Sequence, residues 1–261
     1  MQLQYAVSLW NFIHYANPPS LSEIADILGA NNLGIELWNA LFEGFNLNDA
    51  ATQQRVRELF AGIPVSYHTE IGKTSKSFHQ KQIDTAAAVG ARFLVLHSDN
   101  LYTQNTKELD VDLAGFVVEY GKASHVEIVL ENGQLPFLSN AIKQLPELKI
   151  CLDVGHVYLT SEPMRAFMEQ LGTRITHLHL QEILSPLERG LLGQSGIILD
   201  HYIPGTGGIP LADWTLLFET LKTRNYNGMA VFEIQPRKPL QTAVIGRDFI
   251  NGFFAASNHS D

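Results

Sequence analysis

Short apolar runs recur along this chain, and most of them end on a polar or ionisable residue. Runs of this length between polar segments are typical of strands that are buried on both faces. We therefore predict eight strands, at residues 3–9, 33–38, 63–68, 92–97, 126–131, 148–153, 175–180 and 228–234.

Between these runs, apolar residues return with the period of an amphipathic helix. Ser20 with Glu23 three residues later has the pattern of a capping box, and Gly90 is placed to end a helix. We expect helices at 20–29, 48–62, 75–89, 107–124, 137–145, 162–171, 211–223 and 239–255, and loops at 10–14 and 181–210.

Strands that alternate with helices indicate a parallel sheet. Eight such units fit an α/β fold, a single-domain (β/α)8 TIM barrel over residues 1–261, with its active site at the carboxyl ends of the strands. The rival is a doubly wound open sheet, which needs a glycine-rich loop after its first strand. Residues 8–11 read SLWN and do not provide one.

Composition narrows the functional classes. The chain has 261 residues, 45% of them hydrophobic, which is enough for a sizeable core. Its formal net charge of −9 disfavours a general nucleic-acid binder. A single cysteine, Cys151, excludes an internal disulfide framework. With no run of membrane-spanning length, we expect a cytoplasmic protein without membrane contact. Assembly into a homo-oligomer stays open.

Ionisable residues gather at the predicted strand ends. One such histidine or glutamate by itself is more often a structural residue or part of a solvated edge. Many at successive strand ends of one barrel would converge on its mouth, where a bound cation would relieve the repulsion between the carboxylates. The residues are His68, His97, Glu131, Asp153, His179 and Glu233, with His156 and His201 in the following loops.

Three further residues point into the predicted barrel. His177 shares the parity of His179 and is expected one layer deeper, as a core histidine or a partner of the metal ligands. Glu36 lies inside a strand and is expected to orient its neighbours. Trp38 is a candidate apolar wall against a substrate, although core packing explains it equally well.

The ordered motifs GIELW, VLEN, CLDVGH, HLHLQE, HYIPGTG and VFE resemble the xylose-isomerase-like barrel superfamily over essentially the whole chain. That group includes sugar isomerases, epimerases and the endonuclease IV family. The resemblance implies one divalent metal ion (Mn, Zn, Mg or Co) bound by Glu131, Asp153, His179 and Glu233. It also implies that Glu131 and Glu233 exchange protons with the substrate.

The candidate substrate-binding set is His156, His68, His97 and His201 from the resemblance, with Trp38 as the apolar wall. The resemblance to endonuclease IV gives His156 a further metal ion as its alternative ligand. In endonuclease IV the counterparts of His68 and His97 hold a second metal, so both roles stay open for this pair. That family also has an Asp-x-His pattern, whereas here Asp200 directly precedes His201. A shift of one residue redirects the side chain, so the sequence leaves open whether Asp200 completes a third cation site. A milder departure is Glu182, where aspartate is usual.

Together these features favour a metal-dependent sugar or sugar-phosphate isomerase or epimerase that works by proton transfer through a metal-stabilised enediolate. The expected partner is a small carbohydrate-like molecule. The alternatives are an endonuclease IV-like zinc phosphodiesterase, or a lyase or dehydratase on the same scaffold.

Overall fold

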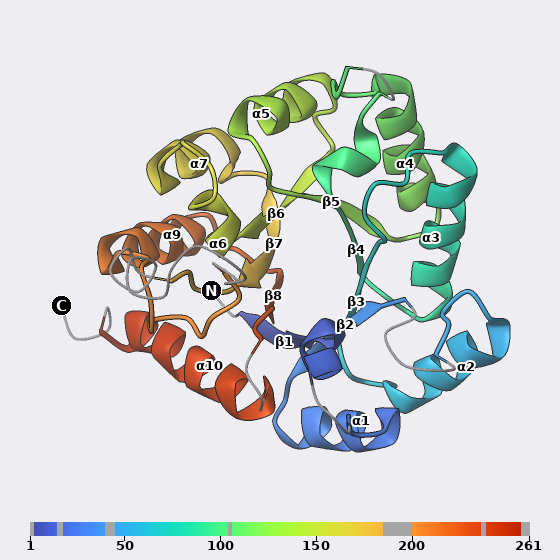
Figure 1. The fold of residues 1–261 in the computed structure, drawn as a ribbon, viewed down its shortest axis with the longest axis horizontal. Coiled ribbons are helices and arrows are strands. Elements are labelled where there is room, and N and C mark those ends of the chain that lie inside the picture. The colour runs from blue at the N-terminus through green and yellow to red at the C-terminus, as the bar shows by residue number, and fades with distance from the viewer. Residues whose placement is uncertain are drawn as a thin grey trace.

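Eight parallel strands close into one barrel in the order in which they occur along the chain (Figure 1). The computed structural model describes residues 3–14, 18–39, 45–103, 106–184, 200–235 and 239–256. The strands are β1 (Gln4–Ser8), β2 (Gly34–Trp38), β3 (Val65–His68), β4 (Phe93–Leu96), β5 (Glu127–Glu131), β6 (Lys149–Asp153), β7 (Ile175–Leu180) and β8 (Met229–Phe232). The predicted (β/α)8 barrel is confirmed.

Helices form the outer ring around these strands (Figure 1). Within the described ranges, no helix is long and apolar enough to cross a membrane. The helical elements are η1 (Leu9–His14), α1 (Leu21–Ala30), α2 (Ala50–Leu59), α3 (Lys76–Ala88), η2 (Ser98–Leu101), α4 (Val111–Ala123), α5 (Leu135–Gln144), α6 (Val154–Val157), α7 (Met164–Leu171), α9 (Leu211–Thr223) and α10 (Pro239–Ala256).

Local signals in the sequence set several of these boundaries. The capping box of α1 is confirmed: Ser20 Oγ accepts from the Glu23 amide at 3.3 Å, and Glu23 Oε2 accepts from the Ser20 amide at 2.8 Å. Gly90 ends α3 with a φ of +77°, which glycine adopts without steric cost. Asp110 caps α4, so this helix starts later than residue 107.

The structure corrects four segments. Residues 10–14 belong to the 3₁₀ helix η1 and are not a loop. Helix α5 starts two residues earlier than expected, because a proline fits its first turn. Helix α7 starts two residues later, after Pro163. The short helix α6 was not expected, since four residues are too few to show a period. In the loop after β7, residues 185–199 lie outside the described part of the chain.

Apolar side chains fill the barrel below its mouth. We call them the apolar plug, and β1, β4, β5, β6 and β8 provide them. Val129, Cys151 and Val231 each stand two positions before a carboxylate, so they face the same interior one layer down. All members of the plug are fully buried: Ala6, Phe93, Val95, Val129, Cys151, Met229 and Val231.

An irregularity in the pairing of β6 with β7 decides which side chains meet at the mouth. The register shifts between Ile150 and Cys151, so Ile150 pairs with Ile175, whereas Cys151 pairs with His177. Bulges of this kind re-aim side chains and are common beside functional sites. Here the shift brings His179 opposite Asp153.

Candidate metal centre

Four side chains from four neighbouring strands meet at the barrel mouth. Glu131 and Asp153 are the last residues of β5 and β6, His179 lies in β7, and Glu233 directly follows β8. His179 Nδ1 lies 3.4 Å from Glu131 Oε1, 3.4 Å from Glu233 Oε2 and 3.7 Å from Asp153 Oδ2. One donor atom from each of the four lies within 4.8 Å of the other three, and all four residues are buried.

These donors suit a divalent cation. Ligand atoms about 2.0–2.2 Å from one ion lie roughly 3–3.6 Å from one another, close to the separations around His179. His179 Nδ1, Glu131 Oε1 and Glu233 Oε1 are buried without a hydrogen-bond partner among the described residues. Such atoms are costly unless they are paired or bind a metal ion. Three carboxylates and one imidazole can therefore hold one cation here.

Glu36 fixes the orientation of His179. The Nε2 of His179 lies 3.1 Å from Glu36 Oε1, and the Nε2 of His177 lies 3.0 Å from Glu36 Oε2. Ser66 Oγ donates to the same Oε2 at 3.0 Å. With its Nε2 hydrogen bound to Glu36, His179 turns the lone pair of Nδ1 towards the other three donors. Glu36 therefore orients its neighbours from one layer below, as expected.

Two amide side chains missed by the sequence reasoning hold Asp153 in place. Asn132 Nδ2 donates to the Asp153 carbonyl at 3.0 Å. Gln181 Nε2 donates to Asp153 Oδ2, and Gln181 Oε1 accepts from the His201 amide at 2.6 Å. Each amide directly follows the carboxyl end of a barrel strand, which is the signal that would have identified it.

His68 and His97 both approach Glu131, one of the four residues of the metal centre. Their Nε2 atoms each lie 3.3 Å from Glu131 Oε2. The ring of Trp38 stacks on His68 at 3.8 Å between centroids. His68 Nδ1 donates to the Thr69 carbonyl at 2.9 Å, so its Nε2 is the atom available to a ligand. His68, Glu131 and His179 also form a second candidate group for a cation.

The structure places Asp200 beside two histidines, one of which, His201, has a left-handed φ of +65°. Asp200 Oδ2 lies 3.7 Å from His156 Nε2, and Asp200 Oδ1 lies 3.8 Å from His201 Nε2. His156, Asp200 and His201 thus form a third group whose donor atoms could hold a cation.

Electrostatics at the mouth favour positive charge. Burial lowers the pKa of His156, but Asp153 and Glu131 beside its ring outweigh burial and raise that pKa to about 10. Burial raises the pKa of Glu131, but the nearby His97 and His179 hold it well below its usual value. Buried carboxylates that stay charged attract a cation, whether it is a protonated imidazole or a metal ion.

Comparison with known proteins agrees with this fold. A family model described as "Xylose isomerase-like TIM barrel" matches residues 20–251. A solved structure of the IOLI protein with a bound zinc atom superposes with a TM-score of 0.72 at 14% identity, covering 95% of this chain and 98% of that one. Identity this low shows the shared fold and nothing more.

Two curated relatives match part of the chain. Fructoselysine 3-epimerase of Shigella flexneri is 26% identical over an alignment of 128 residues, which covers 44% of this chain and 41% of the relative. Inosose dehydratase of Halalkalibacterium halodurans is 25% identical over 111 residues, 40% of this chain and 37% of the relative. The chain therefore spans less than half the length of these relatives. One is an epimerase and the other a dehydratase.

Proposed function

Because the chain belongs to the xylose isomerase-like TIM barrel family, we propose that it is a divalent-metal-dependent isomerase or epimerase of a small sugar or sugar phosphate. The main support is the close group of donor atoms from Glu131, Asp153, His179 and Glu233, which lie within 4.8 Å of one another at the mouth. The similarity to fructoselysine 3-epimerase also favours an epimerase.

These four residues would hold the metal ion. Oxygen-rich ligation with one imidazole is compatible with Mn, Zn, Mg or Co. When bound, such an ion polarises a substrate carbonyl and the hydroxyl next to it. Glu36 keeps the His179 ring in the orientation that presents Nδ1, and Gln181 does the same for the Asp153 carboxylate.

Glu131 and Glu233 would move the protons. They come from β5 and from the end of β8, so two strands separate them around the barrel. One carboxylate removes the proton from the substrate carbon and leaves an enediolate, and the other returns a proton to the opposite face. Removal from one face and return to the other inverts the configuration at that carbon. Both side chains are almost fully buried, which strengthens their electrostatic interaction with a bound substrate.

Histidines around the opening would bind the substrate hydroxyls. The side chains of His97 and His156 are 24% and 23% exposed, so they can contact both the site and an incoming ligand. His201 Nδ1 donates to the Glu233 carbonyl at 3.0 Å, which leaves Nε2 for a substrate oxygen. Trp38, whose ring stacks on His68, would supply an apolar wall for a sugar ring.

Two other reactions fit parts of the same site. The group of His156, Asp200 and His201, together with His68 and Glu131, favours a zinc phosphodiesterase of the endonuclease IV kind. The net charge of −9 opposes the binding of nucleic acid. The similarity to inosose dehydratase favours a dehydratase, which would use the same proton abstraction and then expel a hydroxyl group.

Solvent deuterium exchange separates these reactions. The purified protein with added metal is incubated in deuterated water with a panel of ketoses and ketose phosphates. We expect deuterium at one substrate carbon, together with an epimeric or isomeric product. Loss of water from the substrate would indicate the dehydratase. Cleavage of abasic DNA without any exchange would exclude the isomerase mechanism.

The variant Glu233→Gln tests the proton transfer directly. Glutamine keeps the shape and one oxygen donor but removes the base. Turnover at saturating metal should fall by about 10²–10⁴-fold, the usual contribution of a positioned acid or base. Metal and substrate binding should weaken much less. If excess metal restored nearly all of the turnover, Glu233 would be a ligand only, and the proton-transfer role would be wrong.

A further inference from the structure

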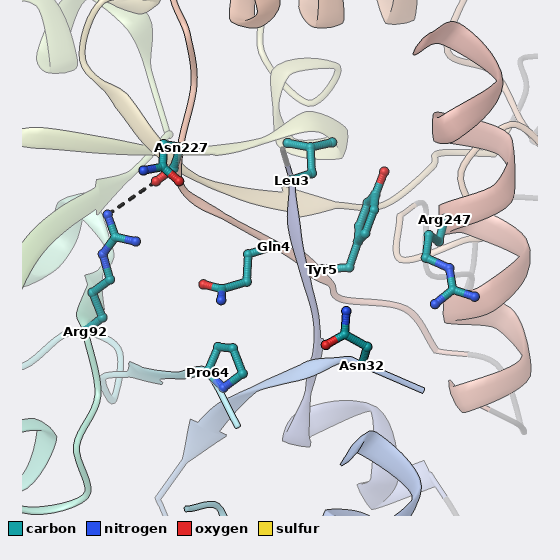
Figure 2. Close-up of a pocket in the computed structure, with 8 residues that line it drawn as sticks. All are labelled: Leu3, Gln4, Tyr5, Asn32, Pro64, Arg92, Asn227 and Arg247. Atoms are coloured by element: carbon teal, nitrogen blue, oxygen red, sulfur yellow. Dashed lines mark hydrogen bonds between the residues drawn. The ribbon is translucent and has the colours of Figure 1, made fainter. Parts of the chain in front are cut away.

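A cavity opens at the opposite end of the barrel from the metal centre. It lies where β1 begins, and the turns before β2, β3, β4 and β8 and one side chain of α10 complete its wall (Figure 2). Its volume is about 330 Å³. Ligand pockets span about 300–1,000 Å³, so this cavity is sized for one small molecule.

Two arginines lie on opposite sides of this cavity (Figure 2). The guanidinium of Arg92 lies over the Phe93 ring at 4.6 Å and donates to the Asn227 carbonyl at 3.3 Å. Arg247 donates from Nη1 to the Asn31 carbonyl at 3.2 Å. An arginine has five N–H donors, so each guanidinium keeps several for a ligand.

The remaining polar groups are also suited to an anion. The side-chain amides of Gln4, Asn32 and Asn227 line the cavity, and none of them has a hydrogen-bond partner among the described residues. No carboxylate lines this cavity in the described part of the chain. Asp248 lies 3.7 Å from Arg247 Nε, and its side chain is 69% exposed.

The cavity is separate from the metal centre. The apolar plug fills the barrel between them, and the members Phe93 and Met229 directly follow the turns before β4 and β8 that line the cavity. A ligand at this end therefore cannot touch the residues at the mouth, and it does not depend on the reaction proposed there.

We propose that this cavity between Arg92 and Arg247 binds a small organic anion through its carboxylate or phosphate group. Planar guanidinium groups recognise such oxyanions with paired hydrogen bonds. The amides of Gln4, Asn32 and Asn227 donate to the remaining oxygens of the ligand.

Calorimetric titration of the full chain tests this proposal, with inorganic phosphate in one arm and succinate in the other. We expect saturable binding of at least one anion, and the tighter one identifies the head group. Arg92→Gln and Arg247→Gln should each raise the dissociation constant by about tenfold or more, the effect of losing one hydrogen bond to a charged group. Arg92→Lys keeps the charge without the planar fork and should fall between wild type and Arg92→Gln.

Arg57→Gln is the matched control. Arg57 also donates to one backbone carbonyl, that of Ala88 at 3.2 Å, but it does not line the cavity. The Arg57→Gln variant should bind the anion with the affinity of the wild type. Unfolding midpoints without anion show whether each variant is folded. Absence of binding by the wild type, wild-type affinity in both cavity variants, or equal weakening in Arg57→Gln would each overturn the proposal.

Discussion

Both carboxylate oxygens of Glu36 lie within hydrogen-bonding reach of His179 Nε2, at 3.1 Å and 3.4 Å. The same carboxylate also receives the Nε2 of His177 at 3.0 Å. A buried glutamate between two imidazoles requires an N–H donor on each of them. This requirement selects the tautomer of His179 and leaves its Nδ1 for the mouth.

Glu36→Gln should therefore weaken metal binding. The NH2 group of a glutamine would face at least one of the two imidazole N–H donors, where it cannot accept a hydrogen bond. The His179 ring would then lose the contact that fixes its orientation. We expect the metal affinity to fall by about 10–100-fold, as for other partners of metal-binding histidines. Isothermal titration with Zn²⁺ or Mn²⁺ measures it. Ser66→Ala is the control, because it removes only the 3.0 Å donor to Glu36 and should change the affinity much less. Equal affinity in Glu36→Gln and the wild type would contradict this role.

Removal of divalent cations should destabilise the fold. Glu131, Asp153 and Glu233 then repel one another in a buried pocket. A cation present at a hundred times its dissociation constant adds about 2.7 kcal/mol of stability, or roughly 5–10 °C in Tm for a chain of this size. Thermal unfolding with and without a chelator measures this shift, and added Zn²⁺ or Mn²⁺ should reverse it. A Tm that is insensitive to both chelator and metal would exclude a resident cation.

The double variant His68→Ala/His97→Ala should keep the metal content of the wild type. In the isomerase reading these side chains bind substrate oxygens, so KM should rise while the number of bound ions stays constant. Metal analysis after gel filtration, together with steady-state kinetics, measures both. The phosphodiesterase reading predicts the opposite outcome, in which one bound ion is lost.

His79 should make the fold sensitive to acid. It is buried on α3, and its Nε2 donates to the Asn100 carbonyl at 3.0 Å. Burial lowers its pKa below the ordinary 6.5, so the unfolded chain takes up a proton more readily than the folded one. Its contribution to stability is complete above the unfolded pKa and decreases as the pH falls through about 6.5.

Urea unfolding of the wild type and of His79→Gln between about pH 8 and about pH 5 tests this loss of stability at acid pH. The free energy of unfolding of the variant should fall less steeply on the acid side. Parallel curves for the two proteins would mean that His79 titrates alike in the folded and unfolded chains.

The sequence predicts the barrel and most of its mouth because both follow from simple periodicity. Apolar runs mark the strands, and strand parity determines which side chains point inward. Glu131, Asp153 and His179 stand at strand ends, where a parallel barrel brings them together whatever the loops do. Helices are missed where the signal is short, as in the four-residue α6 and the 3₁₀ helix after β1.

Other features depend on contacts that no local pattern encodes. Glu36 and His177 are 141 positions apart, and their pairing follows from the closure of the barrel. Asp200 approaches both His156 and His201, which their spacing in the sequence does not determine. Gln181 was overlooked because its role depends on Asp153 and the His201 amide, which lie in two other segments.

The left-handed backbone of His201 has a consequence for the balance between stability and function. An L-residue with a side chain pays about 1 kcal/mol for this conformation, whereas glycine adopts it freely. A histidine here is therefore a poorer choice for folding than glycine would be. The chain gives up a small part of its stability to hold an imidazole beside Asp200, and selection for a more stable fold alone would favour glycine at this position.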